Sequence, residues 1–113
     1  MSLVLGIGAS SSAEPREIDD LITRVLAQQG LSRDEVQLVS TIDWRGEALA
    51  PLCAQYGWDL ITHLAEELDA QLVPNPSDRF PRSVAEAAAQ LHGDLVVTKT
   101  TSERVTLAVA RRR

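Results

Sequence analysis

The stretch LVLGIGASSSAEPREIDDLITRVLAQQG, residues 3–30, predicts a β-strand that passes through a short loop into an α-helix. Residues 3–8 are an unbroken run of apolar residues and glycines, which is typical of a buried strand. Four small residues follow at 9–12, and Pro15 stands where proline favours the first helical turn. Apolar residues with helical spacing then continue towards Gly30, a residue type that commonly ends helices. This strand, loop and helix form one unit of an α/β fold.

The same order of elements recurs beyond residue 30. Residues 36–42 and 58–62 are typical of strands, and residues 47–56 between them carry the apolar stripe of a helix. A short helix is expected at 65–72. Residues 73–82 contain three prolines, so the sequence predicts no regular structure there.

The last third of the chain begins with a helix signal and ends in two strands. Ser83 and Glu86 match a capping box, in which each side chain accepts from the other residue's backbone N–H, and they predict a helix at 84–91. Strands are expected at 95–98 and 105–110. Too few residues separate these strands for a crossover helix, so we expect an antiparallel hairpin.

These elements predict a single α/β domain over residues 1–113. We expect three α/β/α layers around a mostly parallel mixed sheet of about five strands, the last two forming the antiparallel hairpin. Apolar residues make up 44% of the chain, which is enough to build a core. No internal repeat, low-complexity segment or domain linker interrupts the chain.

Charge and composition exclude several classes of function. Eleven basic and sixteen acidic residues give a net charge of −5, and three of the basic residues are the terminal Arg111–Arg113. So acidic a body disfavours nucleic acid as a partner. No apolar run reaches the ~20 residues that a membrane helix needs, and the N-terminus lacks the basic region of a signal peptide. We therefore expect a cytoplasmic protein without a membrane partner.

The cysteine and histidines predict neither a disulfide nor a metal site. Cys53 is the single cysteine and lies on the apolar stripe of the helix at 47–56, so it is expected in the core rather than as a nucleophile. His63 and His92 have no further ligand at metal spacing, although His63 could line a ligand site. No motif predicts a cofactor.

In an open α/β sheet, ligands bind beyond the carboxyl ends of the parallel strands. The first such place is the loop that holds Gly8, Ala9, Ser10 and Ser11. Its backbone N–H groups could hold a carboxylate or phosphate, while the alternative is a tight turn that needs small residues. The glycines do not form the GxGxxG dinucleotide fingerprint.

The second place runs from Thr41 to Glu47. Asp43 and Glu47 could act as general acid or base, and Arg45 could pair with a substrate carboxylate. Thr41 is a further expected binding residue. The alternative is that Asp43 caps the next helix while Arg45 and Glu47 face water.

Lys99 marks the third place, because it is the only lysine and follows the apolar run at 95–98. Lysine at that edge can reach an anion, and the alternative is a solvated hairpin turn. Thr100 beside it and Ser83 complete the expected set of ligand-binding residues.

The order and spacing of several short motifs resemble the CobE family and the C-terminal domain of CbiG, proteins of cobalamin biosynthesis. The resemblance covers roughly residues 3–112. Its carriers are Gly6–Gly8, Thr41–Asp43 with Glu47, Ala65–Leu68, Asn75–Ser77, Ser83–Ala89, Lys99 and Leu107–Arg112. Ala9 replaces the family's cysteine, Ser10–Ser12 replace its basic stretch, and Arg45 replaces its lysine, which puts a thiol-dependent mechanism in doubt.

The resemblance implies an α/β domain that binds or processes a precorrin bearing acetate and propionate groups. Full-length CbiG is linked to opening the δ-lactone of cobalt-precorrin-5A, with loss of acetaldehyde, so a hydrolase activity is one expectation. A non-catalytic carrier or chaperone of corrin intermediates is the alternative, and a small anion-binding interaction domain is a third. Other enzymes of the same pathway are further expected partners.

Overall fold

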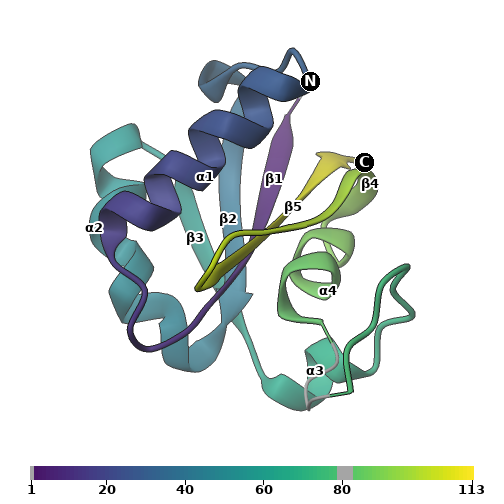
Figure 1. Ribbon diagram of the computed structural model, residues 1–113. Coiled ribbons are helices and arrows are strands. Elements are labelled where there is room, and N and C mark those ends of the chain that lie inside the picture. Colours follow the sequence, from purple (N-terminus) through teal and green to yellow (C-terminus); the bar gives the residue numbers. More distant parts are fainter. Residues whose placement is uncertain (1, 79–82) are drawn as a thin grey trace.

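A five-stranded sheet runs through the middle of the molecule in the order β3-β2-β1-β5-β4 (Figure 1). The structure is a computed structural model that describes residues 2–78 and 83–113. Its main elements are, in chain order, β1 (Leu3–Ala9), α1 (Pro15–Gln28), β2 (Val36–Ile42), α2 (Gly46–Tyr56), β3 (Asp59–His63), α3 (Ala65–Asp69), α4 (Val84–Gln90), β4 (Gly93–Thr101) and β5 (Val105–Arg112). Single turns of 3-10 helix precede β2 (Arg33–Glu35) and α2 (Asp43–Arg45).

Strand β5 is inserted in the sheet against the direction of its neighbours. β1, β2 and β3 pair in parallel, whereas β5 is antiparallel to both β1 and β4. Four strands therefore share one direction, and β5 alone runs the other way. The carboxyl ends of β1 to β4 consequently lie at one edge of the sheet, where the β4–β5 hairpin also turns.

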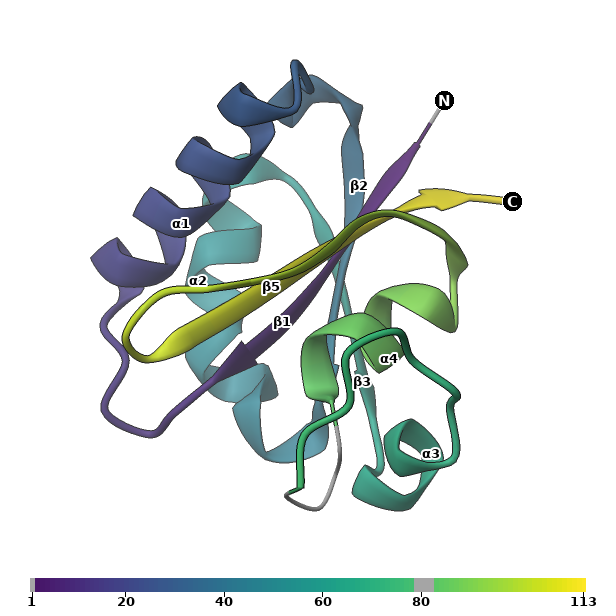
Figure 2. The same cartoon turned by 45° about the vertical axis from the view of Figure 1, so that its right-hand side comes forward.

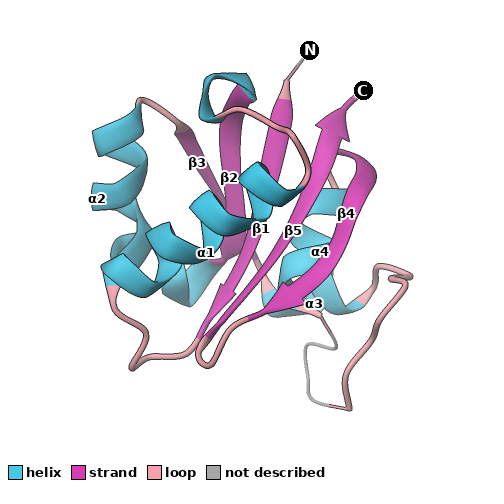
Figure 3. Ribbon diagram, turned by 45° about the horizontal axis from the view of Figure 1, so that its top comes forward, coloured by secondary structure: helices cyan, strands magenta, loops and turns pink. Residues whose placement is uncertain are grey.

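Helices cover both faces of the sheet, which confirms the three-layer mixed α/β architecture. Figure 3 shows α1 and α2 on one face, and Figure 2 shows α3 and α4 on the other. Side chains alternate along β1, because Leu3, Leu5 and Ile7 join the core under α1 and α2. Val4, between them, belongs to the core under α4.

Two helices end as their sequences predict. The buried face of α1 consists of Ile18, Leu21, Ile22, Val25 and Leu26, and Gly30 follows with a positive φ of 67°. Helix α2 stops at Gly57, which adopts the left-handed conformation with φ 73°. Residues with a side chain rarely adopt this conformation, so glycine terminates the helix without strain.

Helix α4 lies unusually close to β1, and Gly6 makes this approach possible. A Cβ atom at Gly6 would stand 2.0 Å from the Ala85 carbonyl oxygen and 2.8 Å from the Ala89 Cβ atom. The alanine-rich sequence of α4 serves the same contact, because Ala85 and Ala89 are buried against the sheet. Small residues on both elements thus replace the larger side chains that usually separate a helix from a sheet.

Three local predictions need correction. Strand β4 runs to Thr101, so Lys99 lies inside a strand and not in the hairpin turn. Helix α3 ends at Asp69 instead of residue 72. The capping box is wrong: Ser83 is the N-cap of α4, but its side chain makes no capping hydrogen bond. The buried Glu86 carboxylate accepts from Asn75 and Lys99 instead. Of the expected irregular segment 73–82, residues 79–82 lie outside the described residues.

Within residues 2–78 and 83–113, none of the helices has the length and apolar character needed to cross a membrane.

Cys53 packs in the core, as expected, and its thiol should be inert in the folded protein. Burial raises the pKa of Cys53 from 9.0 to about 11. This shift lowers the thiolate fraction at pH 8 about 100-fold. We expect a disulfide reagent such as Ellman's reagent to label Cys53 at pH 8 only after unfolding in guanidinium. Equal labelling rates for the folded and unfolded chains would contradict the prediction.

The same shift affects stability at alkaline pH. Since the pKa of Cys53 is higher in the folded state, its stabilising contribution is complete below pH 9 and declines as the pH rises through about 11.

Candidate functional site

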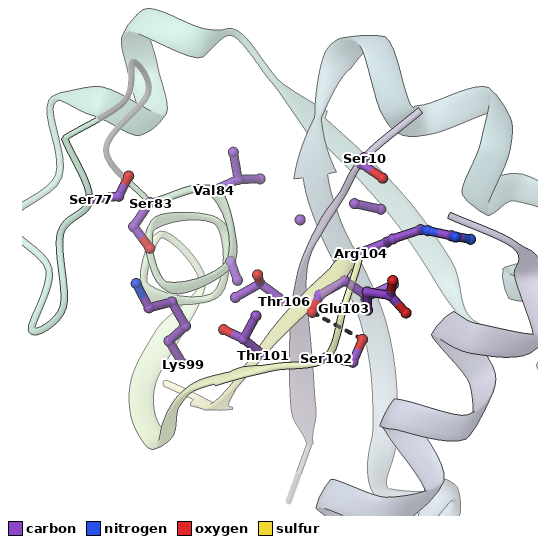
Figure 4. Close-up of a pocket in the computed structure, with 14 residues that line it drawn as sticks. Ser10, Ser77, Ser83, Val84, Lys99, Thr101, Ser102, Glu103, Arg104 and Thr106 are labelled. Atoms are coloured by element: carbon purple, nitrogen blue, oxygen red, sulfur yellow. Dashed lines mark hydrogen bonds between the residues drawn. The ribbon is translucent and has the colours of Figure 1, made fainter. Parts of the chain in front are cut away.

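A pocket of about 490 Å³ opens at the edge of the sheet where β1 and β4 end (Figure 4). Four described parts of the chain line it: the end of β1, the segment around Ser77, the start of α4 and the β4–β5 hairpin. Its described lining residues are Gly8, Ala9, Ser10, Ser77, Ser83, Val84, Ala85, Lys99, Thr101, Ser102, Glu103, Arg104, Val105 and Thr106. The pocket therefore offers several hydroxyl groups and two cationic side chains, with one carboxylate.

Lys99 reaches across the pocket from β4. Its backbone N–H donates to Glu86 Oε2 over 2.9 Å, and its Nζ atom donates to the Asn75 carbonyl oxygen over 3.0 Å. Figure 4 shows the amino group on the side of the pocket where Ser77 and Ser83 lie. A cation in this place can pair with an anionic ligand group.

Ser83 contributes a buried hydroxyl group. Only 7% of the residue is exposed, and its Oγ atom has no hydrogen-bond partner within the described parts of the chain. A buried hydroxyl without a partner is unfavourable, and native structures usually satisfy such groups. Because Ser83 lines the pocket, a bound ligand could supply the missing partner.

The backbone of the hairpin turn is hydrogen-bonded to the residue after β1 and to α1. Ser10 donates its N–H to the Arg104 carbonyl oxygen over 2.9 Å, and the Arg104 N–H donates to Glu17 Oε2 over 2.9 Å. The Ser10 amide is therefore already used inside the protein. Fewer backbone N–H groups of the loop at residues 8–11 are therefore available to bind an anion than the sequence suggested.

The structure brings five of the predicted site residues to the pocket: Gly8, Ala9, Ser10, Ser83 and Lys99. Six others do not line it, namely Ser11, Thr41, Asp43, Arg45, Glu47 and Thr100. Thr41 is fully buried, and its hydroxyl donates to the Ile7 carbonyl oxygen over 2.7 Å. It therefore links β2 to β1, and we do not retain it among the ligand-binding residues.

Arg45 and its acidic neighbours lie beside the pocket. The Arg45 Nε–H donates to the Ala9 carbonyl oxygen over 2.8 Å, which ties the start of α2 to the end of β1. Asp43 and Glu47 are exposed at this same edge of the sheet. The suggested capping role of Asp43 is not seen, since no side chain caps the turn or the helix there.

Sequence reasoning missed Ser77 and the Glu103–Thr106 side of the pocket. Glu103–Thr106 join the site because β5 lies next to β1, and Ser77 joins it from the irregular segment before α4. Neither position follows from a local sequence signal. His63 does not line the pocket; its Nε2 atom lies 2.9 Å from His92 Nε2, and its Nδ1 atom 3.0 Å from Glu67 Oε1. Burial, aided by the charges of His63 and Arg112, lowers the pKa of His92. No group of three or more metal-ligating side chains occurs within the described residues.

Residues 3–110 match the protein family described as cobalamin synthesis G C-terminus. The chain belongs to this CbiG C-terminal family. The resemblance expected from the sequence is confirmed, and the family role is in cobalamin biosynthesis.

Relatives of the CbiG C-terminal family support this assignment. The chain is 29% identical over 118 residues to the cobalt-precorrin-5A hydrolase of Priestia megaterium, with 96% of this chain and 32% of that protein covered. The chain thus spans about a third of the length of this curated relative.

Two solved structures share the fold. CobE, a protein from the cobalamin (vitamin B12) biosynthetic pathway, superposes with a TM-score of 0.83 at 26% identity, covering 99% of this chain and 91% of CobE. Cobalamin biosynthesis protein chiG from Agrobacterium tumefaciens superposes with a TM-score of 0.69 at 24% identity, covering 97% and 98%.

Proposed function

We propose that the pocket binds carboxylate groups at one edge of a precorrin, an intermediate of cobalamin biosynthesis. The observation that carries this proposal is that the Lys99 ammonium and the Ser83 hydroxyl, which has no partner among the described residues, line the same pocket. A volume of about 490 Å³ lies within the range of small-molecule sites. Acetate and propionate side chains of a precorrin have the charge and the acceptor atoms that these two groups require.

Charge explains how such a ligand could be bound and released. Lys99, Arg104 and Glu103 line the pocket, and Arg104 also pairs with Glu17 over 3.9 Å, so Lys99 is the lining cation that faces no carboxylate among the described contacts. The chain as a whole carries −5. A polyanionic ligand is thus attracted locally and repelled by the rest of the surface. This balance suits a domain that holds an intermediate and passes it to another enzyme.

Hydrolysis of the bound intermediate is the second candidate function. The name of the Priestia megaterium relative favours it, and Asp43 and Glu47 are the candidate general acid and base beside the pocket. The described lining residues contain no thiol, because alanine stands at position 9. Product analysis of a mixture with precorrin would show turnover that is lost in Asp43→Asn or Glu47→Gln, while a pure binding domain would return the ligand unchanged.

The decisive experiment is an absorbance titration of the protein with a corrin-ring intermediate that carries free carboxylates. We expect a saturable spectral shift that weakens with salt. Lys99→Ala should reduce the affinity by about 5- to 100-fold, corresponding to the loss of a charge-assisted hydrogen bond. Arg113→Ala makes the same charge change on the exposed tail, where Arg113 pairs with Asp94, and should leave the affinity within about 2-fold. Equal affinities for both variants and the wild type would overturn the site.

Ser83→Ala separates ligand binding from stability. Because the Ser83 hydroxyl has no partner among the described residues, its removal should leave the free energy of unfolding of the ligand-free protein unchanged or slightly higher. Binding of the corrin intermediate should weaken by about 2- to 10-fold, since one hydrogen bond to the ligand is lost. Urea unfolding and the same titration measure the two effects. Unaltered affinity would remove Ser83 from the site.

A further inference from the structure

The two ends of the Lys99 side chain are held by one hydrogen-bonded network. At the backbone, the Lys99 N–H donates to Glu86 Oε2 over 2.9 Å. At its tip, the ammonium donates to the Asn75 carbonyl oxygen over 3.0 Å. Asn75 lies 24 residues before Lys99 in an irregular segment, so this contact depends on what holds that segment in place.

Glu86 is the residue that holds Asn75. The Asn75 backbone N–H donates to Glu86 Oε1 over 2.9 Å, and the Asn75 side-chain amide donates to Glu86 Oε2 over 2.8 Å. Both carboxylate oxygens are therefore occupied, and Oε2 also receives the Lys99 N–H. A single side chain thus fixes the strand from which Lys99 projects and the carbonyl that its ammonium reaches.

Burial restrains the Glu86 end of this network. Glu86 is completely buried on α4, whereas Asn75 is exposed and belongs to no helix or strand. A free lysine side chain samples many rotamers and loses that freedom when it binds a ligand. Holding it beforehand reduces this loss and so strengthens binding.

We propose that Glu86 is a positioning residue that acts through Asn75 to place the Lys99 ammonium in the pocket before a ligand arrives. This inference rests on the proposed function, because the ligand group that Lys99 then meets is the precorrin carboxylate. Glu86 itself does not line the pocket and touches no ligand. Glu86 determines the position of the Lys99 ammonium in the pocket.

The first test needs no ligand. Lys99 is the only lysine, so protein labelled with ¹³C,¹⁵N-lysine gives NMR signals from this side chain alone. In the wild type, the two Hε protons should have distinct chemical shifts because the ammonium is held. In Glu86→Gln they should merge. Within the described residues the Glu86 carboxylate accepts from three N–H donors, and a glutamine NH₂ would oppose one of them. Merged signals in the wild type, or distinct signals in the variant, would overturn the proposal.

Two further variants cover the case in which Glu86→Gln does not fold. Asn75→Ala removes only the side-chain bond to Glu86 from an exposed position, and it should also bring the Hε shifts together. Gln90→Ala is the matched control, because Gln90 also joins α4 to this segment, through a 2.8 Å bond to the Leu72 carbonyl oxygen. The control should leave the Lys99 signals distinct; if they merge as they do in Asn75→Ala, the role assigned to Glu86 and Asn75 is wrong.

A double-mutant cycle on affinity distinguishes positioning from general destabilisation. Titrated with the same corrin intermediate, Glu86→Gln and Asn75→Ala should each weaken binding by about 2- to 10-fold in the wild-type background. In the Lys99→Ala background they should weaken it no further, although Glu86→Gln still lowers stability there because the Lys99 backbone N–H remains its partner. Equal losses in both backgrounds would overturn the inference alone. Full affinity of Lys99→Ala would instead overturn the proposed function, while the NMR result would still stand as the test of positioning.

Discussion

Replacing Gly6 with alanine is expected to lower the free energy of unfolding by at least about 3 kcal/mol, because overpacking against main-chain atoms cannot be relieved by a rotamer change. The new Cβ atom would stand 2.0 Å from the Ala85 carbonyl oxygen and 2.7 Å from the Ala89 nitrogen. These are backbone atoms of α4, so the whole helix would have to move away from β1. Since α4 carries Ser83 and Glu86, the variant should also lose ligand binding.

The matched control for Gly6→Ala lies two residues further along the same face of β1. At Gly8, a Cβ atom would meet the Val84 Cβ atom at 3.3 Å, a contact with a partly exposed side chain at the start of α4. Gly8→Ala should change stability by less than about 1 kcal/mol, partly because alanine restricts the unfolded chain. Equilibrium urea unfolding measures both variants. If Gly6→Ala were as stable as Gly8→Ala, the close approach of α4 to β1 would be refuted.

Glu86→Ala should be the second severe substitution, with a loss of about 3 kcal/mol or more in the free energy of unfolding. The change leaves the partly buried N–H of Lys99 and both donors of Asn75 without their acceptor, and it opens a cavity at the buried Glu86 position. The segment around Asn75 should then exchange its amide hydrogens faster. Chemical denaturation and hydrogen exchange by mass spectrometry would record the two effects.

Gln90→Ala provides the comparison for Glu86→Ala. Gln90 is one turn further along α4 and donates to the Leu72 carbonyl oxygen from a more exposed position. Its amide also donates to Gln71 Oε1 over 3.4 Å, and loss of these two neutral, partly solvent-accessible hydrogen bonds should cost about 1 kcal/mol or less. Comparable losses in the two variants would show that Glu86 is no more important than any other contact between α4 and this segment.

Most of the secondary structure could be predicted because its signals are local. The spacing of Ile18, Leu21 and Val25 already defines the buried face of α1, and Gly30 and Gly57 end their helices through a property of glycine alone. The hairpin of β4 and β5 followed from its short connection. The expected strand at 95–98 was too short, because Lys99–Thr101 continue β4 beside β5 rather than forming the turn.

The candidate site was predicted in part. Lys99 and Ser10 were expected at one sheet edge from the rule for parallel strands, and both line the pocket. Thr41 was expected there for the same reason, but the rule places only its backbone, and its hydroxyl turns to the Ile7 carbonyl oxygen. For Glu86, too, the sequence pattern did not predict what the side chain contacts. Its sequence context matches a cap, whereas its side chain serves Asn75 and Lys99.

The sequence by itself determined the α/β class, the alternation of strands and helices, the burial of Cys53 and the family resemblance, because these depend on periodicity, turn residues and motif order along the chain. Only the tertiary structure decided that β5 lies between β1 and β4, that α4 rests on Gly6, and that Ser77, Ser83 and Arg104 share a pocket. These features depend on contacts between segments far apart in the chain. Their energies arise from packing and hydrogen-bond geometry that no short stretch of sequence encodes.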